Sequence, residues 1–287
     1  MYSKLLSTSL LLPAPKSSRY ISVDIVAQPD GKKKPVIVFV HGFKGFKDWG
    51  PFNLMARYFA EHDFVFIKFN FSHNGTTPFR PEEFVDLEAF GNDNHSRQLD
   101  ELGVLIDRIS DRTKPLLDLE LNRDKIYLVG HSRGGSMVLL KAAEDARVQK
   151  VVTWAAVSDL LSSYSEDDVK DWSRTGVSWI PNARTGQQMP VYYQYYEDLV
   201  ENQERLNVLQ ASAKINQPFL ILHGEKDETV SPVSANAIYQ QTRNSKLEII
   251  AEANHTFGGT HPFAKDELPV QFKELCDKTV LFLKHDL

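Results

Sequence analysis

Apolar runs and stretches of helical periodicity alternate along most of the chain. Residues 36–40 are an unbroken apolar run, Val-Ile-Val-Phe-Val, with no polar alternation. Such a run indicates a strand that is buried on both faces, as in a parallel sheet. The pattern then predicts a helix over 51–62 and a second inner strand over 64–69. This alternation is typical of a βαβ unit, whose crossover is almost always right-handed.

The same cycle continues toward the C-terminus. The other predicted strands are 20–27, 125–129, 151–155, 219–222 and 247–250, and the other predicted helices are 94–112, 132–145, 233–242 and 268–285. Residues 20–27 nearly alternate between apolar and polar, which favours a half-exposed strand. The sequence therefore predicts an α/β fold with a mostly parallel central sheet and helices on both faces.

Two segments interrupt this rhythm. Residues 70–92 are rich in Pro, Gly and Asn and predict a long loop, and long loops in compact domains are often functional. Residues 159–217 are longer than a single crossover helix requires. Within them we predict a hairpin over 176–196, followed by a helical stretch over 197–213. We therefore expect a core domain made of 1–158 and 218–287, and a lid or cap insertion over 159–217.

Composition narrows the class of protein. Hydrophobic residues make up 42% of the chain and charged residues 25%, the balance of a soluble globular protein. A net charge of −5 offers no electrostatic case for binding nucleic acid or an acidic membrane, and no run is long enough to span a bilayer. Cys276 is the single cysteine, which favours a cytoplasmic location, and we interpret it as a buried residue of the last helix.

The first residues superficially resemble a signal peptide. Their apolar stretch is interrupted by Ser7, Thr8 and Ser9, and prolines follow at once. We interpret this segment as a first strand and keep a signal peptide as the alternative.

The segment Gly130-His131-Ser132-Arg133-Gly134 joins a predicted strand to a predicted helix. It fits a nucleophile elbow, a G-x-S-x-G turn that holds a serine in a strained conformation between strand and helix. Small residues are needed two positions before and two after the serine so that strand and helix can pass closely. The bare pattern arises by chance in roughly one chain in twenty of this length, so its strand–turn–helix context carries the interpretation.

A nucleophilic serine needs a base and a group that orients the base. In this architecture the partners follow later strands in the order serine, acid, histidine. Asp227 lies just past the strand over 219–222, and His255 lies just past the strand over 247–250. The order of the three residues predicts a Ser132, His255 and Asp227 triad.

Each partner has rivals. Glu225 and Glu228 flank the aspartate, and Asp159 follows the preceding strand. We prefer Asp227 because it is far enough past the strand to fold back toward a histidine. His261 competes with His255 but lies farther from its strand and precedes a proline.

Two backbone amides fit an oxyanion hole, the set of donors that stabilises a tetrahedral intermediate. One is the amide of Arg133 at the start of a helix, and the other is the amide of Phe43 after His41-Gly42. For His41 the alternatives are a structural side chain between loops and a contact to substrate.

The insertion is rich in aromatic side chains, and these either pack the insertion onto the core or contact substrate. The candidate substrate contacts are His41, Trp179, Tyr192, Tyr193 and Tyr195. The spacing of His, Cys and carboxylate residues does not fit a metal site. The sequence contains no glycine-rich phosphate loop that would indicate a bound nucleotide, so we expect no cofactor.

These segments together resemble the α/β-hydrolase superfamily from about Tyr20 to the C-terminus. The residues that carry the resemblance are Gly130 to Gly135, His41-Gly42-Phe43, Gly224 to Asp227 and Asn254 to Phe257. The chain looks most similar to bacterial cinnamoyl (feruloyl) esterases and to the related serine aminopeptidase and dienelactone hydrolase groups. The resemblance implies a cofactor-free acyl-enzyme mechanism and a lid inserted after the sixth strand, where 159–217 falls. Arg133 and the loop 70–75 depart from the usual esterase pattern and leave the acyl group open.

The sequence thus predicts a serine hydrolase that cleaves carboxylic esters of small or aromatic acyl groups. The partner expected is a small-molecule ester, with no nucleic acid or membrane, and the protein is expected to be a monomer or homodimer. A thioesterase or a serine aminopeptidase would share the triad, and Glu166, Asp167 and Asp168 of the insertion offer carboxylates for an amine. A non-catalytic receptor for a small ligand is the alternative of another class.

Overall fold

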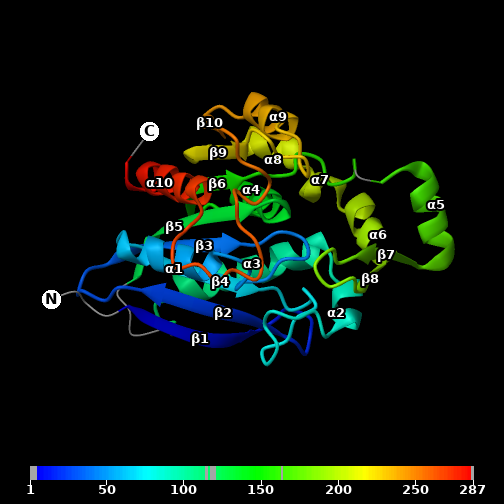
Figure 1. The fold of residues 1–287 in the computed structure, drawn as a ribbon, viewed down its shortest axis with the longest axis horizontal. Helices are drawn as coiled ribbons and strands as arrows, with labels where there is room; N and C mark the ends of the chain where they lie inside the picture. The colour runs from blue at the N-terminus through cyan, green and yellow to red at the C-terminus, as the bar shows by residue number, and fades with distance from the viewer. Residues whose placement is uncertain (1–4, 114–115, 117–120, 163, 286–287) are drawn as a thin grey trace.

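A computed structural model describes residues 5–113, 116, 121–162 and 164–285 (Figure 1). Eight strands form one sheet in the order β1-β2-β4-β3-β5-β6-β9-β10. In that order they are β1 (Leu6–Pro13), β2 (Tyr20–Ala27), β4 (Val65–Asn70), β3 (Lys34–Val40), β5 (Leu121–His131), β6 (Val148–Trp154), β9 (Phe219–Gly224) and β10 (Ser245–Ile250). The pairs β1/β2 and β2/β4 are antiparallel, and all the other neighbours are parallel.

Helices cover both faces of this sheet (Figure 1). Helices α1 (Phe52–Glu61) and α10 (Val270–Lys284) bury their aromatic and aliphatic side chains on one face. Helices α3 (His95–Ser110), α4 (Arg133–Glu144), α8 (Val208–Lys214) and α9 (Val233–Gln241) pack on the other. The predicted fold class, a mostly parallel sheet between two helical layers, is confirmed.

Strand β3 shows why its sequence is unbroken in apolar character. Val36, Val38 and Val40 belong to the core on the α3 and α4 side. Ile37 and Phe39 belong to the core on the α1 and α10 side. Because successive side chains of a strand point to opposite faces, a strand between two helical layers needs apolar residues at every position.

The segment after β6 contains a small second sheet. The elements of this segment are α5 (Glu166–Thr175), β7 (Val177–Pro181), β8 (Gln188–Tyr192), α6 (Gln194–Glu201) and α7 (Gln203–Leu206). Strands β7 and β8 pair antiparallel, so the predicted hairpin is present. Figure 1 shows this region at the end of the molecule away from α10. Helix α8 instead packs against α4 and α9, so the last part of the expected insertion lies on the core.

Two segments differ from the sequence prediction. The predicted loop over 70–92 contains a short helix, α2 (Leu87–Gly91), which Asp86 caps by accepting the backbone N–H of Ala89. The helical stretch predicted over 197–213 is broken into three helices, and Asn207 caps the last of them by accepting the N–H of Gln210. Asparagine side chains compete for backbone donors and so favour helix starts over helix interiors.

The predicted first strand is β1, which pairs with β2 from Leu6 to Pro13; residues 1–4 lie outside the described residues. Cys276 is fully buried on α10, as the sequence predicted. Among the helices of the described ranges, none combines the length and the apolar character needed to cross a bilayer.

Candidate active site

Ser132 lies on a strained turn between β5 and α4. Its backbone has φ 57° and ψ −125°, a conformation that residues other than glycine rarely adopt. A Cβ on Gly130 would lie 2.2 Å from the carbonyl oxygen of Gly134, and a Cβ on Gly134 would lie 2.2 Å from that of Val40. Both positions therefore require glycine, which allows β5, α4 and β3 to approach this closely.

The three side chains predicted as a triad form a continuous chain of hydrogen bonds. The Oγ of Ser132 lies 3.0 Å from Nε2 of His255. The Nδ1 of His255 lies 2.8 Å from Oδ2 of Asp227. Ser132 follows β5, Asp227 follows β9 and His255 follows β10, so all three come from the carboxyl ends of parallel strands. Ligands of α/β proteins bind at this edge of the sheet.

The carboxylate of Asp227 is buried and surrounded by donors. Its Oδ1 accepts the backbone N–H groups of Thr229 at 2.9 Å and Val230 at 2.8 Å. Its Oδ2 also lies 3.2 Å from Nε2 of His223. Burial alone pushes the pKa of Asp227 upward, but the hydrogen bonds to His223, His255 and the backbone together hold the pKa well below its usual range. Asp227 is therefore ionised at neutral pH.

An ionised Asp227 fixes the tautomer of His255. Nδ1 faces the carboxylate and carries the proton, so Nε2 presents its lone pair to the hydroxyl of Ser132. The loop is held by His131, whose Nε2 donates to the backbone carbonyl of His255 at 2.8 Å. Burial lowers the pKa of His131 to about 3, so this second ring stays neutral beside the first. The arrangement can take a proton from the serine and later return it to a leaving group.

The rival residues have other partners. Asp159 accepts the backbone N–H of Leu161 in its own turn, and Glu225 accepts that of Glu252. The exposed Glu228 completes the set of rival acids. Nδ1 of His261 accepts the backbone N–H of Gly50 at 3.0 Å. Of the residues weighed from the sequence, the structure brings only Asp227 and His255 to Ser132.

The loop after β3 passes directly beside the serine. A Cβ on Gly42 would lie 3.0 Å from Cβ and 3.5 Å from Oγ of Ser132. Among the described residues, the backbone N–H groups of Phe43 and Arg133 donate no hydrogen bond, so both are free for a substrate oxygen. The next residue, Lys44, has φ 54°, a conformation that costs on the order of 1 to 3 kcal/mol for a non-glycine residue. Strain of this kind gathers at functional sites.

The side chain of Arg133 is buried next to this loop. Its guanidinium lies 4.4 Å from the centre of the Phe43 ring, and its Nη1 donates to the hydroxyl of Tyr195 at 3.2 Å. Its Nη2 lies 3.4 Å from Oδ2 of Asp93. Burial raises the pKa of Asp93, although Arg133 and Gln98 act in the opposite direction. The sequence marked Arg133 as unusual, and the structure makes it the centre of a buried polar cluster.

A cavity of about 380 Å³ contains Ser132 and His255. Its lining residues are Gly42, Phe43, Lys44, Gly45, Trp49, Phe52, His131, Ser132, Asn182, Ala183, Arg184, His255 and Thr256. Residues 182–184 belong to the turn between β7 and β8, so the hairpin tip lies at the serine. The sequence predicted this turn but not its position, because the docking of a hairpin depends on tertiary contacts.

None of the five predicted substrate contacts is among the residues that line this cavity, so their contact with substrate stays a prediction. His41 is buried, with its Nδ1 2.9 Å from the carbonyl oxygen of Gly42. Burial lowers the pKa of His41 to about 4, so the ring is a neutral structural element. Trp179 is 57% exposed and lines a separate cavity of about 640 Å³ with Trp172.

Tyr192 and Tyr195 pack the hairpin region onto the rest of the chain, and Tyr193 packs within the inserted segment. Tyr192 donates its hydroxyl to Glu88 at 2.6 Å. Tyr193 contacts the ring of Trp172, and Tyr195 is buried against His95. Aromatic packing, one of the two alternatives open from the sequence, describes these contacts.

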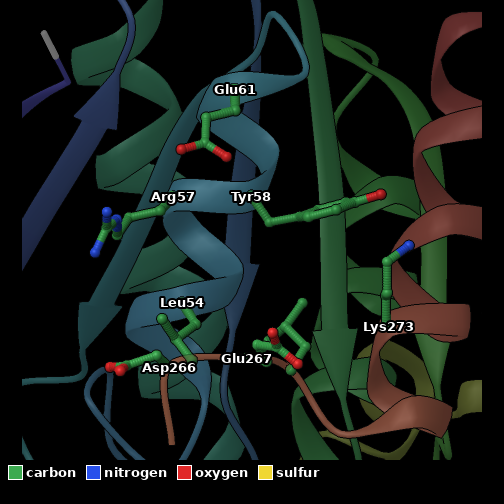
Figure 2. A pocket seen from close by; sticks show the side chains of 8 residues that line it. Leu54, Arg57, Tyr58, Glu61, Asp266, Glu267 and Lys273 are labelled. Carbon is green, nitrogen blue, oxygen red and sulfur yellow. The ribbon is translucent and has the colours of Figure 1, made fainter.

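A larger cavity of about 690 Å³ lies between α1 and α10 (Figure 2). Figure 2 shows Arg57, Tyr58 and Glu61 on α1, with the ring of Tyr58 pointing toward Lys273 of α10. Among the residues that the structure describes, no serine, cysteine or histidine lines it. Within the described ranges no three His, Cys, Asp or Glu side chains are placed to hold a metal ion. Of these two cavities, the one at Ser132 therefore holds the side chains that can act in nucleophilic catalysis.

Comparison with known proteins places this site within a recognisable sequence family. The model of the prolyl oligopeptidase family matches residues 117–270, which is more than half of the chain and includes Ser132, Asp227 and His255. The uncharacterized peptidase YtmA of Bacillus subtilis is 31% identical over 113 residues, 39% of this chain and 38% of that protein. The human serine hydrolase BPHL is 30% identical over 146 residues, 46% of this chain and 48% of that protein. The matched part of the chain spans less than half the length of both relatives.

Solved structures share the fold over nearly the whole chain. Est1E from Butyrivibrio proteoclasticus superposes with a TM-score of 0.65 at 17% identity and covers 96% of this chain and 98% of its own. Est1E with ferulic acid bound gives the same TM-score at 18% identity and covers 95% and 98%. At these identities the likeness shows a common fold.

Proposed function

The chain belongs to the prolyl oligopeptidase family of the α/β-hydrolase superfamily and is a serine hydrolase, and from this premise we propose that it cleaves carboxylic esters of small or aromatic acyl groups. In the proposed mechanism Ser132 attacks the carbonyl carbon while His255, oriented by Asp227, takes the serine proton. The amides of Phe43 and Arg133 donate to the oxyanion. His255 then protonates the leaving alcohol, and water releases the acyl group by the reverse sequence.

The observation that carries this proposal is the pair of hydrogen bonds made by one imidazole. His255 lies 3.0 Å from the Oγ of Ser132 and 2.8 Å from Asp227, within the reach that proton transfer requires. The strained backbone of Ser132 supports the same role, because it exposes the hydroxyl at the start of a helix. A protein that only binds its ligand has no chemical need for this arrangement.

The lining of the cavity supports an ester over an aminopeptide substrate. An aminopeptidase needs a carboxylate to pair with the free amine of its substrate, and no Asp or Glu of the described residues lines the cavity at Ser132. The carboxylates considered for this role, Glu166, Asp167 and Asp168, occupy the first turn of α5 and are exposed. Acidic side chains there stabilise the helix dipole.

We also propose that the inserted segment acts as a lid over the acyl group. Asn182, Ala183 and Arg184 at the hairpin tip line the cavity, and Lys44 donates to the carbonyl of Pro181 at 3.1 Å. A small-molecule ester is the only partner that the proposal requires.

The test is a turnover panel with the wild type and Ser132→Ala. The panel contains p-nitrophenyl acetate, p-nitrophenyl butyrate, methyl ferulate, an acyl-coenzyme A and aminoacyl amides. We expect the wild type to hydrolyse the esters and the variant to lose this activity. Absence of ester hydrolysis in the wild type, or equal rates in both proteins, would overturn the proposal. Preferred turnover of the coenzyme A ester or of the amides would replace the ester assignment with a thioesterase or a peptidase.

A further inference from the structure

The cavity at Ser132 combines an apolar wall with two cationic side chains. Phe43, Trp49 and Phe52 form the apolar wall, while Lys44 and Arg184 bring two cations. No Asp or Glu stands among the lining residues. The chain as a whole has 38 acidic and 33 basic residues, so this local excess of cations does not follow from composition.

Asn182 presents a donor without an acceptor. Asn182 is only 7% exposed, and its Oδ1 accepts the backbone N–H of Arg184 at 3.2 Å. This bond leaves the amide nitrogen as the free end, and among the described residues that nitrogen has no hydrogen-bond partner. A buried donor without a partner is costly, so an acceptor on a ligand would satisfy it.

Lys44 links the loop after β3 to the hairpin. Its ammonium donates one hydrogen bond to the carbonyl of Pro181, and an ammonium has three N–H groups to donate. In the described part of the chain no carboxylate lies within ion-pair distance of Lys44. Its left-handed backbone keeps this cation next to Phe43, beside the amide assigned to the oxyanion.

Arg184 is exposed at the hairpin tip, and its guanidinium forms no ion pair with a described carboxylate. Two neighbouring groups mark its surroundings. Burial and the charge of Arg184 lower the pKa of His261, and Glu82 acts on the same ring in the opposite direction. Glu82 is therefore an acidic side chain near His261, and it forms no ion pair with Arg184.

We propose that this cavity selects esters that carry a carboxylate a few bonds from the scissile carbonyl. Arg184, Lys44 and the amide nitrogen of Asn182 would bind the carboxylate, and the aromatic wall would hold the apolar part of the substrate. An Arg fork matches a carboxylate, and charge-assisted hydrogen bonds are about twice as strong as neutral ones. This substrate class rests on the proposed ester hydrolysis by Ser132.

The test compares charged and neutral esters of similar shape. The first pair is mono-4-nitrophenyl adipate and 4-nitrophenyl hexanoate, which differ by a carboxylate on the acyl group. The second pair is 3-acetoxybenzoate and 3-acetoxybenzamide, which differ by a carboxylate on the leaving group. We expect kcat/KM, after subtraction of spontaneous hydrolysis, to be about tenfold higher for the charged member of at least one pair. The preference should shrink as salt is added, because salt screens exposed charges.

Arg184→Glu should lower the charged-to-neutral ratio of kcat/KM about tenfold or more. Arg174→Glu is the matched control, because Arg174 is an exposed arginine of α5 that does not line the cavity, and the change in net charge is the same. The control should leave the ratio within about twofold. An equal fall in both variants would overturn the inference, since it would reflect net charge alone.

The remaining outcomes separate the inference from the proposed function. Turnover of the neutral esters that depends on Ser132, with no preference for either charged ester, would overturn carboxylate selection and leave the ester hydrolase standing. Failure to hydrolyse any of the four esters would overturn the proposed function, and the inference with it.

Discussion

The guanidinium of Arg133 lies 4.4 Å from the centre of the Phe43 ring, so the side chains of the two residues assigned to the oxyanion hole pack against each other. One residue follows the nucleophile directly, and the other lies in the loop after β3. Their contact ties the two free amides to one another through a buried cation. A cation over an aromatic face stabilises by about 2 kcal/mol when it is shielded from water.

Arg133→Met should therefore lower both stability and turnover. The substitution leaves Asp93 buried without its cation, and removal of one partner of a buried pair costs about 3 to 5 kcal/mol. We expect urea unfolding to show a loss of this order, and kcat to fall with little change in KM. The double variant Asp93→Asn, Arg133→Met should recover most of the stability. A single variant as stable as the wild type would contradict this role for the pair.

Gly134→Ala should prevent the elbow from forming. The new Cβ would lie 2.2 Å from the backbone oxygen of Val40, and a backbone atom in the core cannot move away at low cost. We expect a large loss of soluble folded protein, measured by circular dichroism and expression yield. Gly103→Ala in α3 is the control, because its Cβ would meet only the flexible end of Lys141 at 3.3 Å. A helical Gly→Ala change should stabilise by about 0.5 to 1 kcal/mol.

Glu101→Gln should change how stability depends on pH. Glu101 is fully buried and accepts the backbone N–H of Ser72 at 2.8 Å, and burial raises its pKa to about 7. Between about pH 4.5 and 7 the unfolded chain loses this proton while the folded protein keeps it, so the wild type becomes less stable as pH rises. The glutamine variant lacks this loss of stability. From pH 4.5 to pH 8 its free energy of unfolding should rise by on the order of 3 kcal/mol relative to that of the wild type.

Urea unfolding at several pH values measures this difference. Glu204→Gln, at an exposed glutamate of α7, is the control and should show no pH-dependent difference from the wild type. A constant difference between Glu101→Gln and the wild type across this range would mean that Glu101 is ionised in the folded protein throughout.

Asp227→Asn should reduce kcat by roughly 10³- to 10⁴-fold, because an asparagine favours the wrong tautomer of His255. Asp159→Asn and Glu225→Gln should stay within about threefold of the wild type, since neither side chain bonds to the histidine. The comparison uses p-nitrophenyl butyrate at saturating concentration. A larger effect at Asp159 or Glu225 than at Asp227 would move the acid to that residue.

Much of the fold was readable from local patterns. β3 was predictable because a strand between two helical layers must be apolar at every position, from Val36 to Val40. The start of β5 was missed because Asn122, Arg123 and Asp124 carry no strand pattern, and the segment joins the sheet by pairing with β3. Helix α2 was missed because five residues are too few to show a period.

The candidate site also has a part that local patterns could predict and a part that they could not. Ser132, Asp227 and His255 could be placed because parallel strands deliver their carboxyl ends to one edge of the sheet. The substrate contacts could not be placed, because they depend on where the hairpin docks. Lys44 and Pro181 meet although they are 137 residues apart in the chain, and no local pattern reports such a contact. The tyrosines stood out in composition, but their rings are used for packing.

The most direct test of the central claim is covalent labelling by a fluorophosphonate, followed by mass spectrometric mapping of the modified peptide. The probe reacts with a serine only when a base activates it. The label therefore tests whether His255, whose Nε2 lies 3.0 Å from the Oγ of Ser132, activates this serine. We predict a single label on Ser132, which is lost in His255→Ala and retained in His261→Ala. A label on another residue, or labelling of Ser132 that is unchanged in His255→Ala, would contradict the account.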